Sequence, residues 1–235
     1  MLFVRSLLFF LWFALLSTAM AIVFLPVLAM PAGATVWMSR SWARATFWGL
    51  RVLAGIDWQV RGTPPRGAVL VAAKHMSMWD TLALWLVLDR PGIVLKRELL
   101  RIPFYGWYLW KGAAIPIDRG AGAKALRRMN QAAQTVLGQG RPILIFPEGT
   151  RKKPGAPPDY KPGVAGLYGL LGIPCVPVAL DSGVYWTGFL KRPGTITLEF
   201  LEPIAPGLKR AAFMEQLEGR IETATRRLVG ARTPS

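Results

Sequence analysis

Residues 7–30 form a 24-residue stretch without a charged side chain, and this stretch is the feature that most constrains how the chain can fold. It is long enough for a helix that is embedded in a membrane. The small residues of Ser17–Ala21 also suit a cleavable signal peptide. However, the apolar run continues for nine residues past Ala21, and the single cysteine, Cys175, gives no sign of an oxidising compartment. We therefore expect a retained membrane helix.

Residues 36–56 differ from this stretch because aromatic side chains alternate with arginines. Arg40, Arg44 and Arg51 are four and seven residues apart, which places them on one face of a helix. Such a helix lies at the membrane surface with its basic residues toward anionic headgroups. The two segments predict a membrane-embedded helical hairpin, and the alternative is a plain transmembrane span followed by a linker. Arginines on this flank indicate that the following domain is cytoplasmic.

The composition narrows the class of partner. The chain has 29 lysines and arginines against 13 aspartates and glutamates, a net charge of +16, with 52% hydrophobic residues and 10 tryptophans. This combination fits an anionic membrane surface better than nucleic acid, because lysine and arginine bind phosphates while indole rings settle at the headgroups. One histidine and one cysteine argue against a zinc or iron–sulfur site of the usual ligand types. We expect neither a metal nor another cofactor.

From Ile56 onward, strand-like and helix-like segments alternate. The expected strands are Ile56–Val60, Ala68–Ala73, Gly92–Lys96, Ala114–Ile117, Pro142–Phe146, Pro174–Leu180 and Thr195–Leu201. The expected helices are Thr81–Leu88, two short pieces within Arg97–Trp110 that meet at Ile102–Pro103, Gly122–Leu137, Val164–Leu171 and Leu208–Val229. This order predicts an α/β fold with a central mixed, partly parallel sheet flanked by helices. We divide the chain into N-terminal membrane-associated helices, residues 1–55, and an α/β domain, residues 56–235.

The only histidine, His75, lies in Lys74–Asp80, between an expected strand and an expected helix. Histidine suits proton transfer near neutral pH, so His75 is the candidate general base and Asp80 the candidate to orient it. A continuous helix would turn Asp80 about 140° away from His75. The two side chains can therefore meet only if His75 lies in the turn and Asp80 near the helix start. On their own, they also fit an ordinary polar loop residue and a helix cap.

A second group of functional side chains, Glu148, Gly149, Thr150 and Arg151, follows the expected strand Pro142–Phe146. The carboxyl ends of strands in α/β sheets are the usual place for ligands. Arg151 can bind a phosphate through paired hydrogen bonds, and Gly149 permits a close approach of the backbone. The alternative is a surface turn with an internal ion pair between Glu148 and Arg151.

Together the two stretches resemble the glycerolipid acyltransferase family, which includes 1-acyl-glycerol-3-phosphate acyltransferases. That family has a His-x4-Asp motif, here His75 to Asp80, and a downstream FPEGTR motif, here Phe146 to Arg151. Two further blocks are similar, Lys96–Arg119 and the proline-containing Val176–Leu180. The resemblance covers residues 56–204, so residues 56–235 are expected to be the acyltransferase domain. Lys74 departs from the asparagine that often precedes the histidine, which leaves the acceptor open.

The resemblance implies that His75 removes a proton from the free hydroxyl of a lysophospholipid, which then attacks the thioester of acyl-carrier protein or coenzyme A. Asp80 would hold the histidine tautomer. Arg151 matches the phosphate ligand of the family, and Lys96, Glu148, Gly149 and Thr150 are expected to complete the acceptor site. Met76, Met78 and Trp79 fit either an acyl path or simple packing.

For an acceptor of 1-acyl-glycerol-3-phosphate, acylated at its sn-2 hydroxyl, the product would be phosphatidic acid for phospholipid synthesis. The expected partners are a lysophospholipid, an acyl thioester and an anionic membrane surface, with no nucleic acid. The expected location is the inner membrane, with the catalytic domain facing the cytoplasm. Two alternatives remain: acylation of another lysolipid, such as a lyso-amino-acid lipid, and a non-catalytic protein that binds membrane lipid.

Overall fold

The strands form a central sheet whose spatial order differs from their order in the chain. The computed structural model describes residues 1–102, 105–112, 114–117 and 122–231. Within these residues, seven strands pair in the order β1-β9-β6-β2-β5-β3-β4, and β7 and β8 form a separate pair. The strands are β1 Ile56–Arg61, β2 Leu70–Ala73, β3 Gly92–Lys96, β4 Ile115–Ile117, β5 Ile143–Ile145, β6 Cys175–Leu180, β7 Trp186–Thr187, β8 Leu190–Lys191 and β9 Gly194–Phe200.

The central sheet is mixed and mostly parallel, as the sequence predicts. Strands β6 and β9 are antiparallel, whereas the other neighbouring strands of this sheet run parallel. Because β6, β2, β5 and β3 share one direction, their carboxyl ends meet at one edge of the sheet. The residues that follow these strands are therefore brought together there.

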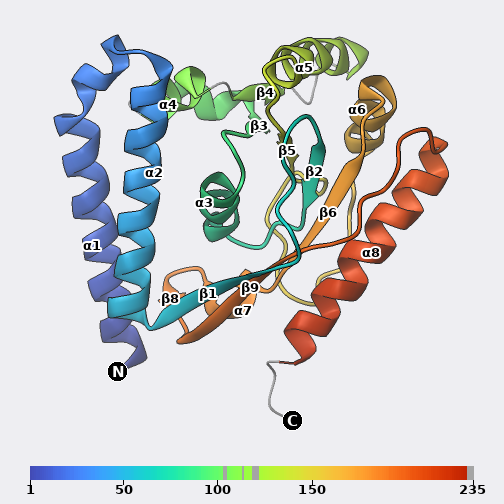
Figure 1. Cartoon of the computed structure of the whole chain (residues 1–235). Helices are drawn as coiled ribbons and strands as arrows, with labels where there is room; N and C mark the ends of the chain where they lie inside the picture. The colour runs from blue at the N-terminus through green and yellow to red at the C-terminus, as the bar shows by residue number, and fades with distance from the viewer. Residues whose placement is uncertain (103–104, 113, 118–121, 232–235) are drawn as a thin grey trace.

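Helices cover both faces of the sheet (Figure 1). They are α1 Leu2–Val23, α2 Ala32–Gly49, α3 Met78–Val87, α4 Tyr105–Lys111, α5 Gly122–Leu137, α6 Gly163–Leu171, α7 Ser182–Tyr185 and α8 Arg210–Gly230, with short helical turns η1 Leu25–Ala29, η2 Leu50–Ala54 and η3 Arg97–Arg101. Alternate residues of β2 point to opposite faces: Val71 belongs to the core beneath α1, α2 and α3, and Leu70 to the core beneath α5, α6 and α8. The fold is thus three layers, helices on sheet on helices.

Helices α1 and α2 lie side by side and run in opposite directions (Figure 1). Among the described residues, α1 is the one helix long and apolar enough to cross a membrane, and only 11% of its most apolar stretch is buried. Phe9 of α1 reaches the core, and Phe47 of α2 stacks on Trp79 of α3 with ring centroids 5.5 Å apart. The pair therefore rests on the α/β domain on one side and exposes apolar side chains on the other. Its embedding in a membrane stays a prediction.

Arg44 and Arg51 are exposed, as the sequence predicts, but Arg40 does not face outward with them, and for Arg40 the prediction is wrong. Arg40 donates a hydrogen bond to the carbonyl oxygen of Leu88, just after α3, at 2.6 Å. Arg51 lies beyond α2, in the π-helical turn η2, and pairs with Asp57 at 3.3 Å. The carbonyls at the end of α3 need donors that the helix itself does not supply, and the Arg40 guanidinium provides one.

Other boundaries agree with the sequence prediction to within a few residues. The prediction missed α7 and the β7–β8 pair, because Ser182–Lys191 is too short and irregular for a periodic pattern. The predicted bend at Ile102–Pro103 and the end of the Lys96–Arg119 block fall partly outside the described residues.

The contact between α1 and α2 can be tested by Gly49→Ala. A Cβ atom at Gly49 would lie 2.2 Å from Cδ1 of Trp12. The indole would have to move, and its hydrogen bond to the carbonyl oxygen of Ala45, now 3.2 Å long, would be lost. We expect the free energy of unfolding to fall by about 1–3 kcal/mol, measured by denaturation in detergent.

Gly33→Ala is the matched control, because a Cβ at Gly33 on the same helix meets nothing within 4 Å. We expect this variant to be neutral or slightly more stable, since alanine favours a helix over glycine. Equal stability of the Gly33 and Gly49 variants would contradict the packing of Trp12 against α2.

Candidate active site

His75 and Asp80 meet at the junction between β2 and α3. Ser77 is the N-cap of α3, and its Oγ accepts the backbone N–H of Trp79 at 3.2 Å. Asp80 closes a capping box, because its Oδ2 accepts the backbone N–H of Ser77 at 2.8 Å. His75 lies in the turn before the cap, and its Nδ1 is 3.0 Å from the same Oδ2. The structure thus has the arrangement that the sequence spacing requires, with His75 in the turn and Asp80 near the start of the helix.

The Asp80 carboxylate is completely buried and receives further hydrogen bonds. The backbone N–H of Met76 donates to Oδ2 at 2.6 Å, and the hydroxyl of Ser182 donates to Oδ1. Sequence reasoning missed Ser182. Its position two residues after β6 is a usable signal, because β6 lies parallel to β2 and its carboxyl end must lie beside His75. These donors hold the carboxylate in one orientation.

The His75 ring is held from a second side by Phe146. The two rings stack with centroids 4.0 Å apart and an interplanar angle of 22°, and 13% of the His75 side chain is exposed. With Nδ1–H donated to Asp80, Nε2 is the nitrogen that can accept a proton. The arrangement holds the imidazole in one orientation, and a histidine held in this way can serve as a general base.

The turn after β5 is hydrogen-bonded to the His75 segment. The backbone N–H of Lys152 donates to the carbonyl oxygen of His75 at 2.8 Å. Gly149 has φ +64°, which side-chain-bearing residues rarely adopt, and its N–H donates to the carbonyl oxygen of Phe146 at 2.9 Å. This turn leaves the side chains of Thr150 and Arg151 exposed. The structure thus joins the two sequence motifs into one site.

Glu148 does not lie at the surface with Arg151. Its residue is 1% exposed, and its Oε1 pairs with Nζ of Lys74 at 2.8 Å. Burial raises the pKa of Glu148, and the nearby Glu222 raises it further, while Lys74 and the backbone N–H of His75 act in the opposite direction. Glu148 is therefore placed to act through its neighbours, and the internal pair that it forms is with Lys74.

Lys96 lies at the same edge as the other candidate residues, but on another strand. It ends β3, is exposed, and is two strands away from β2, which corresponds to roughly 10 Å at the usual strand spacing.

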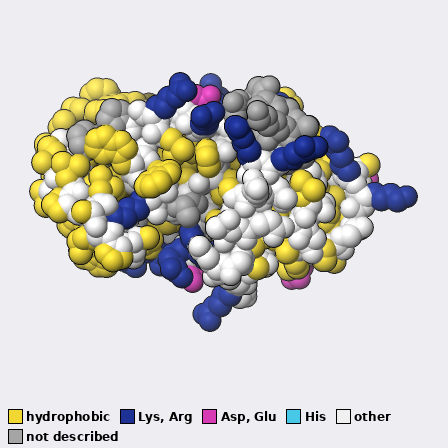
Figure 2. Space-filling model, turned by 90° about the horizontal axis from the view of Figure 1, so that it is seen from above, with side chains coloured by type: hydrophobic (Ala, Val, Ile, Leu, Met, Phe, Trp, Pro, Cys, Tyr) yellow, Lys and Arg dark blue, Asp and Glu magenta, His cyan; other side chains and the backbone are white. Residues whose placement is uncertain are grey.

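Seen from above, hydrophobic side chains gather densely at the end of the molecule that holds α1 and α2, and lysines and arginines lie over other parts of this face (Figure 2).

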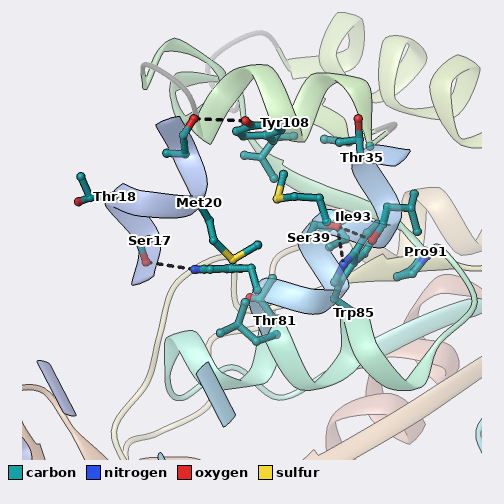
Figure 3. Close-up of a pocket in the computed structure, with 18 of the residues that line it drawn as sticks. Ser17, Thr18, Met20, Thr35, Ser39, Thr81, Trp85, Pro91, Ile93 and Tyr108 are labelled. Atoms are coloured by element: carbon teal, nitrogen blue, oxygen red, sulfur yellow. Dashed lines mark hydrogen bonds between the residues drawn. The ribbon is translucent and has the colours of Figure 1, made fainter. Parts of the chain in front are cut away.

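An apolar cavity of about 510 Å³ lies between α1, α2, α3 and α4 (Figure 3). Met20, Ser39, Trp85 and Tyr108 contribute to its wall, one from each helix. It reaches Thr81, the residue after Asp80. Its polar groups pair largely with one another: the Trp85 indole donates to Ser39 at 3.1 Å, for example. A long hydrocarbon chain would fit such a lining.

Met76, Met78 and Trp79 do not line this cavity. Trp79 is 1% exposed and packs between Phe47 and Trp58. Simple packing therefore describes Trp79 better than an acyl path.

Among the described residues, no cluster of three or more histidine, cysteine, aspartate or glutamate side chains could hold a metal ion.

Comparisons with known proteins agree on one family. The sequence model of the family described as Acyltransferase matches residues 58–181. A 1-acyl-sn-glycerol-3-phosphate acyltransferase of Pseudomonas aeruginosa is 38% identical over 161 residues, 67% of this chain and 63% of that protein. The human 1-acyl-sn-glycerol-3-phosphate acyltransferase alpha is 33% identical over 68% of this chain and 59% of its own. The match thus spans less than two thirds of either relative.

Two other similar proteins match over more of their length. A lyso-ornithine lipid O-acyltransferase of Pseudomonas aeruginosa is 29% identical over 215 residues, 82% of this chain and 81% of that protein. The crystal structure of the 1-acyl-sn-glycerophosphate acyltransferase PlsC from Thermotoga maritima superposes on the whole chain with a TM-score of 0.80, at 21% identity and with all of both chains covered. This likeness shows the fold.

The burial of Glu148 makes a prediction for stability against pH. The folded state holds the pKa of Glu148 above its ordinary 4.5, so it binds this proton more tightly than the unfolded state does. This stabilising contribution is present below pH 4.5. It is lost as the pH rises through the raised pKa that Glu148 has in the folded protein. Glu148→Gln cannot titrate, so the unfolding free energy of the natural chain minus that of the variant should fall as the pH rises above 4.5.

Urea unfolding in detergent from below pH 4.5 to about 8 measures this difference, whose slope is at most about 1.4 kcal/mol per pH unit for one proton. A difference that rises with pH, or that is constant, would contradict the burial of a titrating carboxyl group here.

Proposed function

Because this chain belongs to the acyltransferase family, we propose that it transfers an acyl chain from an acyl thioester to the sn-2 hydroxyl of 1-acyl-glycerol-3-phosphate. The product is phosphatidic acid. The observation that carries the proposal is the 3.0 Å contact between Nδ1 of His75 and Asp80, at the edge of the sheet that also carries Arg151. The names of the similar proteins support the same reaction.

His75 acts as the general base in this proposal. Nε2 takes the proton of the acceptor hydroxyl while the hydroxyl oxygen attacks the thioester carbonyl carbon. Asp80 holds the Nδ1–H tautomer and stabilises the imidazolium that forms. The tetrahedral intermediate then breaks its C–S bond, and the imidazolium returns the proton to the thiolate. A thiolate is a good leaving group, so the proposed step needs no metal or other cofactor.

Arg151 is the proposed ligand for the acceptor phosphate. It is exposed beside the His75 segment, and a guanidinium can bind phosphate through two parallel hydrogen bonds. Lys96 adds positive charge from the next strand, and Gly149 and Thr150 shape the turn. Glu148 does not contact the acceptor in this proposal, because its carboxyl group is buried against Lys74.

The apolar cavity beside α3 is the proposed place for an acyl chain. It reaches Thr81, next to the catalytic pair, and its lining is apolar (Figure 3). A pocket enclosed by helices favours hydrocarbon over water. Acyl-carrier protein and coenzyme A present the same thioester to this site, so the donor is assigned by assay rather than by the cavity.

We place the enzyme at the inner membrane, with residues 1–55 as its membrane-associated helices and residues 56–235 facing the cytoplasm. Exposed apolar side chains of α1, such as Phe10 and Leu15, support membrane association. The net charge of +16 favours an anionic lipid surface. Both the acceptor and the product of the proposed reaction are lipids of such a surface.

A lyso-ornithine lipid is a second candidate acceptor. The acyltransferase of that name aligns with 82% of this chain, more than the first relatives do. An ornithine headgroup carries one carboxylate and one ammonium group and has no phosphate, so loss of Arg151 should affect the two candidate acceptors differently.

The catalytic pair is tested by His75→Ala and Asp80→Asn. Removal of the base should lower kcat by about 10³-fold, and loss of the tautomer-holding carboxylate by about 10²- to 10⁴-fold. The assay measures labelled acyl transfer from both thioester donors to each lysolipid, with vesicle sedimentation to show that membrane association persists.

Asp89→Asn is the matched control, because Asp89 is exposed beyond the other end of α3. It removes the same charge and should leave kcat unchanged. Substantial turnover in His75→Ala would refute the proposed mechanism.

The acceptor is tested by Arg151→Gln. Loss of a charged, paired contact should raise KM for 1-acyl-glycerol-3-phosphate by about 10- to 100-fold, with little effect on a lyso-ornithine lipid. Arg61→Gln is the control, since Arg61 is exposed at the end of β1, four strands away from β5 in the sheet. An equal effect of Arg151→Gln on both acceptors would count against a phosphate role.

A further inference from the structure

Lys74, the residue before the catalytic histidine, points into the protein. It is 2% exposed, and its Nζ lies 2.8 Å from Oε1 of Glu148 and 2.6 Å from Oε1 of Glu222. The hydroxyl of Tyr160 donates to the same Glu222 oxygen at 3.0 Å. A lysine so enclosed cannot contact an acceptor headgroup at the surface.

The partners of Lys74 come from three distant parts of the chain. Glu148 lies in the turn that also carries Arg151, Tyr160 lies in the loop before α6, and Glu222 lies in the C-terminal helix α8. Lys74 itself extends the pairing of β2, because its N–H donates to the carbonyl oxygen of Val178 on β6 at 2.9 Å. A single ammonium group therefore joins the catalytic segment to α8.

The connection continues from Lys74 to the backbone of His75. The backbone N–H of His75 faces the Glu148 carboxyl group, and its carbonyl oxygen accepts the N–H of Lys152. The carbonyl group of the histidine is thus held by the turn that Lys74 anchors. Movement of Glu148 would move the backbone on which the His75 ring depends.

We propose that Lys74 is a positioning residue for the catalytic histidine, with Glu222 of α8 as its counter-charge. The proposal rests on the acyl transfer proposed above and deepens it. Lysine in this position is compatible with the fold because α8 supplies a second carboxylate to a buried cation. Lys74 therefore governs the rate of the chemical step and leaves acceptor choice to the exposed edge.

Three variants test this role by steady-state kinetics: Lys74→Met, Glu222→Gln and the double variant. Lys74→Met leaves two buried carboxyl groups without their cation, and a displacement of His75 by about 1 Å should lower kcat by about 10- to 100-fold. KM for the acceptor should change by less than about threefold, because no group that binds it is altered. The double variant should recover at least tenfold of the lost kcat, because the excess negative charge is removed.

NMR of histidine-labelled protein gives a second measurement, because His75 is the only histidine in the chain. Several charged or titratable groups surround the side chains of His75 and Lys74. They are Asp80 from α3, Glu148 from the turn after β5, Tyr160 from the loop before α6, and Glu218 and Glu222 from α8. Removing the Lys74 cation should raise the titration midpoint of the His75 signal, and removing the Glu222 anion should lower it. Each shift should be about 0.3 pH unit or more, as for a unit charge ~10 Å away.

Arg227→Gln is the control for the docking of α8, because Arg227 joins that helix to Glu199 of β9 at 2.6 Å, away from His75. It should change neither kcat nor the midpoint. If Lys74→Met does not fold, kcat and the titration midpoint are measured on Glu222→Gln instead, because this variant keeps the Lys74–Glu148 pair.

Unchanged kcat with an unmoved midpoint in the folded Lys74→Met protein, or shifts of the same sign in both single variants, would overturn the inference. A double variant as impaired as Lys74→Met would also overturn it. The titration needs no substrate, so absent turnover in the natural chain, with the opposite shifts intact, would refute the proposed reaction and support the coupling of Lys74 to His75.

Discussion

The hydrogen bonds of the Asp80 carboxylate are the interaction on which the site depends. One oxygen accepts the N–H groups of Met76 and Ser77, which lead into α3, and also accepts Nδ1–H of His75. The helix start and the orientation of the His75 ring are therefore set by the same atom. If α3 began one residue later, Asp80 would turn by about 100° and both functions would be lost together.

The distance along the chain decides which features the sequence can predict. The capping box and the His75–Asp80 contact lie within six residues, so spacing alone states the geometry they need. The alternation of strands and helices is also local, and most elements are found where the sequence places them. The Lys74–Glu222 pair joins residues 148 positions apart, and no periodic pattern relates them. The same limit hides Ser182, which only the order of the sheet brings to Asp80.

Basic residues also fasten the N-terminal helices to the rest of the protein. Nζ of Lys111 in α4 donates to the carbonyl oxygen of Leu28 at 2.6 Å, in the connection between α1 and α2, and Arg40 donates to Leu88 beyond α3. Carbonyls at helix ends need such donors. These contacts hold the exposed apolar side of α1 in a fixed relation to α3, and hence to His75. A membrane surface that binds α1 would therefore also set the position of His75 relative to that surface.

The Lys74 cluster is better understood through geometry than through stability. Taking one ammonium and two carboxyl groups out of water costs as much as their attraction returns, so a well-packed apolar cluster of the same volume would be at least as stable. The charged cluster, however, adds a directional requirement, because Nζ of Lys74 must lie near both Glu148 and Glu222 at once. That requirement admits one arrangement of β2, the turn after β5 and α8. The residue that follows Lys74 on the chain is His75, the proposed general base, so the same requirement fixes the backbone that carries it.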